Sequence, residues 1–380
     1  MSAAIATYPA PAESWADRAR RVAAEFGRNA ARHDADDSFV ADNYARLKAE
    51  GFFKAHVPAE LGGGGASYRD MCDAIRCIAA SCGATGLAFA MHTHLVAAAV
   101  WRRQHQNAPT EGLLKRVAAE DLVLVSSGGS DWLKSAGTAV KTDDGFLITA
   151  RKAFSSGCRA GDLLMTSAVY DDPWVGPTVL HFGVPLKAKG VTINETWKVM
   201  GMRETGSDDV VMEDVFVAEA AISGRRPQAK WHMLFHVISM IAFPLIYAAY
   251  AGVAEGARAE ALKLVKGRAD DGDLPILAGE LENAFAQTEM ALERMIDTAE
   301  TQMPGAETTS RTMVARTLAG EAAIRTVTQA LELAGGGAFY RKHGLERAFR
   351  DVQGARFHPL QGKAQLRYSG RVALGLDIDG

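Results

Sequence analysis

The stretch WKVMGMRETGSDDVVMEDVFV, Trp197–Val217, ends a long run of short apolar segments and decides the fold class. The run begins near Asp121 and contains LVLVSS, GFLITARKAF, DLLMTSAVY and PTVLHFGVPL, which are separated by Gly, Asp and Pro. Short β-branched segments between such turn residues predict strands. We therefore expect an all-β domain at residues 122–225, which at about 100 residues has a usual domain size.

The sequence has a helical pattern on both sides of this region. In the N-terminal part, Trp15, Ala19, Val22 and Phe26 recur at the spacing of one helix face. Long helical patterns return at Trp231 and continue to about Gln353, with interruptions at RADDGDLP and QMPGAETTS. The sequence therefore predicts an α+β fold with a helical domain at 1–121, the β domain at 122–225 and a helical bundle at 226–380.

Composition excludes several classes of protein. The chain has 380 residues, 48% of them hydrophobic, and its 42 Lys and Arg against 45 Asp and Glu give a formal charge of −3. A chain of this length buries a large core, and its balanced charge provides no field for nucleic acid or an anionic membrane. We expect small molecules or further copies of the chain as partners.

The cysteines and the N-terminus indicate the compartment. Cys72, Cys77 and Cys82 recur every five residues within one helical segment, and Cys158 stands alone. This spacing fits neither a metal site nor a disulfide framework, so we expect reduced thiols and no metal. The first residues lack a basic start followed by an apolar segment, which argues against export. The sequence therefore predicts a cytoplasmic protein.

One apolar stretch has the length of a membrane span. Residues 237–254 carry no charge over 18 positions. The stretch contains Pro244 and Gly252, lacks flanking clusters of Lys and Arg, and runs directly into a charged helical segment. We interpret it as a central helix of the bundle and expect no membrane partner.

Four strings in order resemble the acyl-CoA dehydrogenase superfamily. PAELGGGG, Pro58–Gly65, is similar to the first glycine-rich turn of that family, and GGSDW, Gly128–Trp132, resembles its flavin-facing β-segment. The stretch Trp197–Val217 looks like the signature that closes its β domain, and ALELAGGGAFYRKHGLERAFRD, Ala330–Asp351, matches its C-terminal segment without a gap. The resemblance covers nearly the whole chain. It implies a β-barrel-like central domain, a C-terminal four-helix bundle, a flavin cofactor and a homo-oligomer, either a tetramer or a dimer.

The β-region contains residues suited to a flavin ring. Such a ring is flat and apolar with polar edges, so its site needs backbone amides and small hydroxyls. Val125, Ser126 and Ser127 provide such a wall, and Phe154 can lie against the ring. The resemblance places the hydroxyl of Ser156 at flavin N5.

The resemblance also assigns cofactor contacts near the end of the bundle. Arg268 sits where the family has an arginine that reaches a cofactor phosphate across a subunit interface, and Gly335 and Gly336 belong to the turn under a neighbouring subunit's flavin. The sequence departs from the family pattern in the RADDGDLP segment and at Glu332, and both departures affect the adenosine-diphosphate end of that cofactor. FAD and FMN therefore both remain candidates.

The base of an acyl-CoA dehydrogenase is missing. That reaction needs a carboxylate aimed at the substrate over the flavin. The family's glutamate position becomes Pro359 or Gln361, depending on the alignment, and the segment Ile238–Gly252 has no acidic residue and lacks the arginine expected there. His358 lies next to the missing base.

Histidines point to a different reaction. His92 and His94 lie on a helix that the family layout places over the flavin, so that they and His358 converge on one site. This arrangement resembles the reduced-flavin monooxygenases of two-component systems, including the dibenzothiophene monooxygenase type. Those enzymes imply a hydroxyl at N5, a histidine that manages protons and a dry cavity. Ser156, His358 and one of His92 or His94 fill these catalytic roles.

The leading hypothesis is therefore a flavin-dependent oxidoreductase that uses reduced flavin and oxygen to hydroxylate or oxygenate a small apolar or aromatic substrate, with a separate flavin reductase or electron-transfer partner. The alternative is an acyl-CoA dehydrogenase with a relocated base. A third class, a non-catalytic relative that binds nucleic acid or a partner protein, is disfavoured by the balanced charge. The expected substrate pocket lies on one bundle helix and contains Phe235, His236, Met240, Phe243 and Tyr247.

Overall fold

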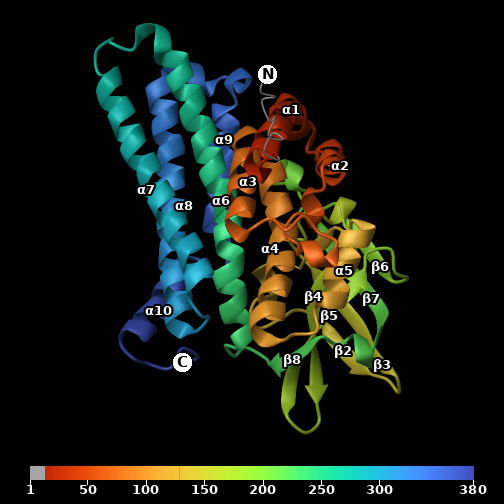
Figure 1. Cartoon of the computed structure of the whole chain (residues 1–380). Coiled ribbons are helices and arrows are strands. Elements are labelled where there is room, and N and C mark those ends of the chain that lie inside the picture. The colour runs from red at the N-terminus through yellow and green to blue at the C-terminus, as the bar shows by residue number, and fades with distance from the viewer. Residues whose placement is uncertain (1–12, 128) are drawn as a thin grey trace, which may run out of the picture.

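A computed structural model describes residues 13–127 and 129–380. The N-terminal helices, the sheet and the long C-terminal helices follow one another along the chain and pack side by side (Figure 1). This order of helices, sheet and helices confirms the fold class predicted from the sequence. The last strand ends at Pro227, two residues beyond the expected boundary of the β domain.

The N-terminal part is helical because its apolar residues lie on helix faces, and two of its helices, α1 and α3, have capped starts. The hydroxyl of Ser14 accepts a hydrogen bond from the Asp17 amide at 3.1 Å, and Ser67 and Asp70 form a reciprocal capping box. Its helices are α1 (Trp15–Asp36), α2 (Ala41–Ala49), α3 (Tyr68–Ser81), α4 (Gly83–Gln106) and α5 (Glu111–Glu120).

The central region forms one mixed sheet. β1 and β2 pair with β4 in parallel, whereas the other pairings are antiparallel, and the main strand order is β6-β7-β3-β2-β4-β5-β8. Burial alternates along β3 and β7, so one face of the sheet packs on its own apolar core. The strands are β1 (Leu124–Ser126), β2 (Thr138–Lys141), β3 (Gly145–Lys152), β4 (Leu163–Asp172), β5 (Gly176–Pro185), β6 (Val191–Asn194), β7 (Asp209–Ala218) and β8 (Gly224–Pro227).

Three long antiparallel helices dominate the C-terminal part, and α10 packs on α8 at the end nearest the C-terminus (Figure 1). Helix α6 leads away from β8, and α8 ends in the short helix η8 (Gly335–Phe339) at the opposite end of the bundle. The C-terminal helices are α6 (Met233–Val265), α7 (Leu274–Thr301), α8 (Ala306–Ala334), α9 (Leu345–Val352) and α10 (Gly362–Ala373).

Helix α6 is the centre of the molecule because it packs against α3, α4, α7 and α8. Two glycines allow α3 to approach closely: an added Cβ at Gly252 would lie 2.3 Å from the Arg76 carbonyl oxygen, and one at Gly256 would lie 2.1 Å from the Ala80 carbonyl oxygen. Helices α4 and α6 are both long and apolar enough to cross a membrane, but 89% and 94% of their apolar windows are buried inside the protein. The apolar stretch at 237–254 is thus a core helix, as predicted.

The four cysteines are thiols without disulfide partners within the described ranges. Burial raises the pKa of Cys82 and of Cys158 to about 12, so both remain protonated at neutral pH.

Candidate active site

Loops from the sheet and the C-terminal segment meet at one place. A Cβ added to Gly129, in the loop after β1, would lie 2.9 Å from the ring of Pro359, so the backbone of this loop packs closely on that ring. The loop after β3 is bonded to the segment before β7, because the Ser155 amide donates to the Asp208 carbonyl at 3.1 Å and the Gly157 amide to the Thr205 carbonyl at 2.9 Å. The loop after β1 thus meets the segment that carries His358, and the loop that carries Ser156 is joined to the segment before β7.

Ser156 lies at the end of a directed chain of hydroxyls. Thr205 donates its proton to the Met202 carbonyl at 2.9 Å, so it accepts from Ser207 at 2.6 Å, and Ser207 in turn accepts from Ser156 at 2.7 Å. Because the Ser156 proton is used within this chain, its oxygen is left to accept a hydrogen bond. Ser156 is therefore arranged to receive an N–H group.

Ser127 is oriented by a buried ion pair that sequence reasoning missed. Its hydroxyl donates to the Asp131 carboxylate at 2.6 Å, and Lys152 contacts both oxygens of that carboxylate at 2.7 and 2.9 Å. Lys152 has 0% exposure, and burial lowers its pKa while Asp131 opposes this effect. Val125 is fully buried, whereas Ser126 is half-buried. In the predicted flavin-facing wall, the side chain of Ser127 is thus oriented by the buried Asp131–Lys152 pair.

Phe154 is the exposed aromatic of this region. Its side chain is 53% exposed, its φ of 60° lies in the left-handed region, and its ring meets Trp197 edge-on with 5.9 Å between centroids. Left-handed backbone is costly for a bulky residue and is found where the surroundings impose it. The loop therefore presents an apolar ring beside Ser156.

His358 is held by the bundle. The hydroxyl of Tyr250 lies 2.8 Å from His358 Nε2, and the hydroxyl of Tyr247 donates to the Ala355 carbonyl at 2.6 Å. The Arg316 guanidinium donates to the main-chain carbonyls of His358 and, at 2.9 Å, of Leu360. Burial, together with the nearby Arg316, lowers the pKa of His358 to about 3, so the ring is neutral.

The tautomer of His358 follows from Tyr250. Burial raises the pKa of Tyr250 well above its usual value, so the phenol keeps its proton. His358 is the hydrogen-bond partner of that phenol in the described structure, so the phenol donates to Nε2 and leaves the proton of the ring on Nδ1. His358 is therefore an N–H donor.

The histidines of α4 differ in their contacts. His92 Nδ1 accepts from the Leu124 amide at 2.9 Å, and its Nε2 donates to the Phe53 carbonyl at 2.7 Å, so both nitrogens are bonded to main chain. Among the described residues, the one hydrogen bond of the His94 ring joins Nδ1 to the Ala90 carbonyl at 3.2 Å, and the proximity of His94 contributes to the lowered pKa of His358. Burial lowers the pKa of both α4 histidines to about 4. His92 therefore joins α4 to β1, whereas His94 lies close enough to His358 to affect its pKa.

The five predicted pocket residues of α6 are buried together. Trp132, which follows the loop after β1, packs on Phe235 with 4.8 Å between ring centroids and on Phe243 at 6.2 Å. His236 is engaged with Thr309 through a 2.8 Å hydrogen bond at Nδ1. An aromatic region therefore extends from the sheet loop across α6, and Met240 and Tyr247 continue it.

The remaining predicted cofactor residues lie elsewhere in the chain. Arg268 follows α6, and Gly335 and Gly336 follow α8, at the end of the bundle away from β8 (Figure 1). A Cβ at either glycine would meet no atom within 4 Å. One chain does not bring these residues to Ser156, so their contact with a neighbouring subunit's cofactor stays a prediction.

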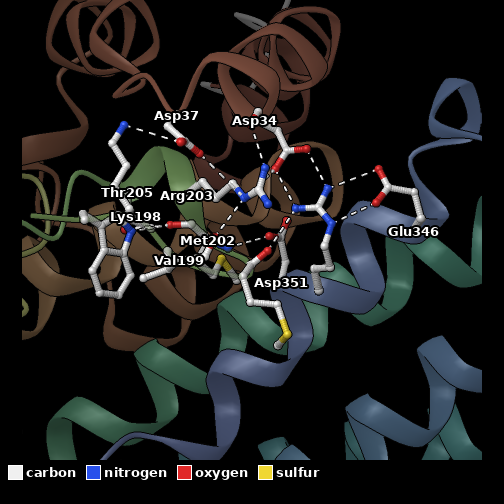
Figure 2. Close-up of polar contacts among 12 residues, drawn as sticks. Asp34, Asp37, Lys198, Val199, Met202, Arg203, Thr205, Glu346 and Asp351 are labelled. Atoms are coloured by element: carbon white, nitrogen blue, oxygen red, sulfur yellow. Dashed lines mark hydrogen bonds and ion pairs between the residues drawn. The ribbon is translucent and has the colours of Figure 1, made fainter.

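A polar cluster beside the site explains two of the sequence motifs. Arg350 of α9 is bonded to both oxygens of Asp34 on α1, at 2.6 and 2.8 Å, and to Glu346. Figure 2 shows Asp34 and Glu346 in this cluster. The residue after Arg350, Asp351, accepts from the Met202 amide at 2.6 Å, and Arg203 lies 3.7 Å from Asp37. The GMRETGS and RD motifs thus join the three parts of the chain.

Glu204 is a buried carboxyl within this cluster. Its side chain is 1% exposed, and its Oε2 has no hydrogen-bond partner in the described structure. Burial, followed by the charge of Asp351, raises the pKa of Glu204 to about 8. Glu204 is therefore protonated in the folded protein at neutral pH.

This protonation predicts a pH dependence of stability. The unfolded chain releases the Glu204 proton near its ordinary pKa of 4.5, but the folded chain keeps it until about pH 8. Unfolding therefore releases a proton between these values, and the free energy of unfolding falls by up to about 1.4 kcal/mol per pH unit as the pH rises. Glu204→Gln is expected to flatten this slope in urea titrations from pH 5 to 8. Glu213→Gln, an exposed control on β7, keeps it, and an unchanged slope in the Glu204 variant contradicts the prediction.

Comparison with known protein families gives two matches along the chain. Residues 11–116 match the model for the acyl-CoA dehydrogenase N-terminal domain, and residues 244–359 match that for the acyl-CoA dehydrogenase C-terminal domain. Together the matches cover more than half of the chain.

Individual relatives are similar over nearly their full lengths. The chain is 26% identical to the putative acyl-CoA dehydrogenase YdbM of Bacillus subtilis, covering 91% of this chain and 92% of that one. It is 27% identical to the indole-3-acetate monooxygenase of Acinetobacter baumannii, covering 94% and 92%. The FMN-bound structure of TdsC, a dibenzothiophene monooxygenase from Paenibacillus sp. A11-2, has a TM-score of 0.84 at 20% identity and covers 96% and 99%. The chain therefore belongs to the acyl-CoA dehydrogenase superfamily, as its motifs predicted.

Proposed function

We propose that the chain is a flavin-dependent monooxygenase that uses reduced flavin and oxygen on a small apolar or aromatic substrate. The observation that carries this proposal is His358, a neutral N–H donor held by Tyr250 and Arg316 beside the sheet loops. The positions where the family's dehydrogenases have their base hold Pro359 and Gln361. Neither side chain removes a proton from carbon.

The residues present fit a flavin. The hydroxyls of Ser156 and Ser127 each donate a hydrogen bond to a protein group, so their oxygens are left as acceptors. Such acceptors complement the N–H groups at the edge of a reduced flavin. Phe154 exposes an apolar ring beside them. The chain is a flavin-dependent oxidoreductase, and relatives of known structure in this superfamily bind FMN. We favour FMN over FAD.

A bound reduced flavin supplies the two electrons with which oxygen is activated. Ser156, whose own proton is donated to Ser207, would accept a hydrogen bond from a bound flavin and help to orient it. The Nδ1–H of His358, kept there by Tyr250, would be available as a hydrogen-bond donor to a negatively charged oxygen. The buried rings of α6 and Trp132 exclude water from the reacting atoms.

The proposal extends to partners and location. Relatives named indole-3-acetate monooxygenase and dibenzothiophene monooxygenase support oxygenation of an aromatic substrate. A separate reductase would deliver reduced flavin, and Arg268, Gly335 and Gly336 would contact the cofactor of a neighbouring subunit in a tetramer or dimer. The enzyme acts in the cytoplasm.

Reduced FMN tests the proposal. The protein is expected to bind reduced FMN anaerobically at micromolar concentration, and the loaded protein to change the time course of flavin oxidation when it is mixed with oxygen in a stopped-flow spectrometer. Oxidation at the rate of free FMN, with or without protein, contradicts the proposal. Riboflavin serves as the probe for the contribution of the phosphate.

The second candidate is an acyl-CoA dehydrogenase with a relocated base, because YdbM and other relatives carry that name. That function predicts a tightly bound oxidised flavin that acyl-CoA thioesters bleach without oxygen. An unchanged flavin spectrum after addition of acyl-CoA thioesters of several chain lengths removes this candidate.

A further inference from the structure

Two buried hydrogen-bond donors beside the aromatic region lack partners. The Nε of Arg316 and the indole Nε1 of Trp132 are both inaccessible, and neither has an acceptor among the described residues. Buried donors in folded proteins are nearly always bonded, so each exception calls for an acceptor. The Arg316 and Trp132 donors therefore both require an acceptor that the described residues do not provide.

The two donors border the same ring. The Arg316 guanidinium carbon lies 5.8 Å from the Phe243 ring centroid and 5.4 Å from that of Tyr247. The Trp132 ring lies 6.2 Å from the Phe243 ring. The donors come from α8 and from the loop after β1, and both side chains lie beside Phe243 of α6.

Arg316 is also a buried charge without a counter-ion. Its side chain is 3% exposed, and no carboxylate lies within 4.0 Å of it in the part of the chain that the structure describes. Asp131 and Asp379, which flank the aromatic region, are already paired with Lys152 and Lys230. Removing an isolated cation from water is costly unless an anion is close.

The contacts of Arg316 with the C-terminal segment satisfy only some of its hydrogen-bond donors and do not neutralise its charge. Its two terminal nitrogens bind the carbonyls of Leu360 and His358, which are neutral dipoles. Those bonds hold the C-terminal segment but leave both the charge and the Nε hydrogen unsatisfied. Arg226, which stacks on Phe235 at 4.5 Å and also binds main-chain carbonyls, adds a second positive charge on the other side of the region.

We propose that this aromatic region binds a substrate that carries an anionic oxygen, such as an arylacetate, with its carboxylate directed at Arg316 and Trp132. This inference rests on the proposed function and names the substrate class of the same site. The anion neutralises the buried guanidinium and accepts from both donors, while the aromatic part of the substrate packs on Phe243 and Phe235.

Matched pairs of acids and amides test the inference. Indole-3-acetate, phenylacetate and benzoate are titrated calorimetrically into the protein, each beside its uncharged amide. At least one acid is expected to bind about tenfold tighter than its amide, because hydrogen bonds to charged groups are the stronger ones. If no acid in the panel binds tighter than its amide, the inference is overturned.

Variants locate the effect. Arg316→Gln is expected to weaken acid binding about tenfold or more and amide binding by less than about twofold. Trp132→Phe keeps the ring and removes the donor, so it tests the same contact without disturbing the C-terminal segment. Arg102→Gln on α4 is the matched control for a change of net charge. Equal loss for acid and amide in both site variants assigns them a structural role and overturns the inference.

The flavin phosphate is the other source of an anion. FMN and riboflavin are titrated into the Arg316 variant, and a loss of FMN binding without loss of riboflavin binding assigns Arg316 to the cofactor and overturns the substrate proposal. The acid and amide titrations need no flavin. Their failure with normal uptake of reduced FMN therefore leaves the proposed function intact, whereas failed FMN uptake with normal acid preference contradicts only that function.

Discussion

Replacing His358 with asparagine is expected to lower turnover about 10²- to 10⁴-fold, the range in which a positioned proton-handling side chain contributes. Asparagine places an amide N–H near the position of Nδ1, but it has no nitrogen at the position of Nε2, so the Tyr250 hydroxyl no longer orients that donor. The carbonyl contacts of Arg316 involve the main chain and persist in the variant. Reduced FMN binding is therefore expected to stay within about twofold, and steady-state assays with equilibrium flavin titration separate the two quantities.

Two further variants identify the cause of that loss. Tyr250→Phe removes the hydroxyl that sets the tautomer, so turnover is expected to fall less than in the His358 variant and the pH profile to change. His92→Gln is the control, because both of its nitrogens serve the main chain. That control should lower stability while the folded fraction keeps its turnover. Unchanged turnover in the asparagine variant removes His358 from the site.

Lys152→Met is expected to cost about 3–5 kcal/mol of the free energy of unfolding, which is the usual effect of breaking a buried pair. Lys152 is fully buried, and its removal leaves the Asp131 carboxylate, 7% exposed, without its cation. Urea denaturation at pH 7 measures the loss. Since domains are stable by only about 5–15 kcal/mol, this single change consumes a large part of the total.

The double variant Lys152→Met with Asp131→Leu separates charge from packing. Removing both charges is expected to recover much of the lost stability, because no unpaired ion then remains buried. Arg151→Met is the matched control on the same strand. Its partner contact with Asp209 is made by a side chain that is 69% exposed, so the expected cost is below about 1 kcal/mol. Equal costs for Arg151→Met and Lys152→Met contradict the interpretation.

Much of the fold was predictable because hydrophobic periodicity reports burial directly. The charge-free stretch at 237–254 predicted the core helix, and the β-branched segments predicted the sheet. The motifs led to the superfamily because close backbone approaches leave signatures of small residues, as Gly129 against Pro359 illustrates.

The site was only partly predictable, since sequence spacing does not report contacts between distant segments. His92 and His94 are two residues apart on a helix and so face different directions, but only the structure reveals which one lies close to His358. Arg316 resembles any arginine of an amphipathic helix, and its lack of a counter-ion follows from the packing of α8 against the C-terminal segment. Glu204 stands in a recognised motif, but its burial depends on α1 and α9.

The hydroxyls from Ser156 to Thr205 all donate their hydrogen bonds in one direction. The last acceptor of the chain, the Met202 carbonyl, sets that direction. Thr205 gives its proton to the Met202 carbonyl, and every later hydroxyl must then point the same way. The amide of the same residue donates to Asp351 of α9. Met202 is therefore bonded to the bundle through its N–H and to the hydroxyl chain through its C=O. The Met202 carbonyl thus determines that the Ser156 oxygen is left to accept a hydrogen bond.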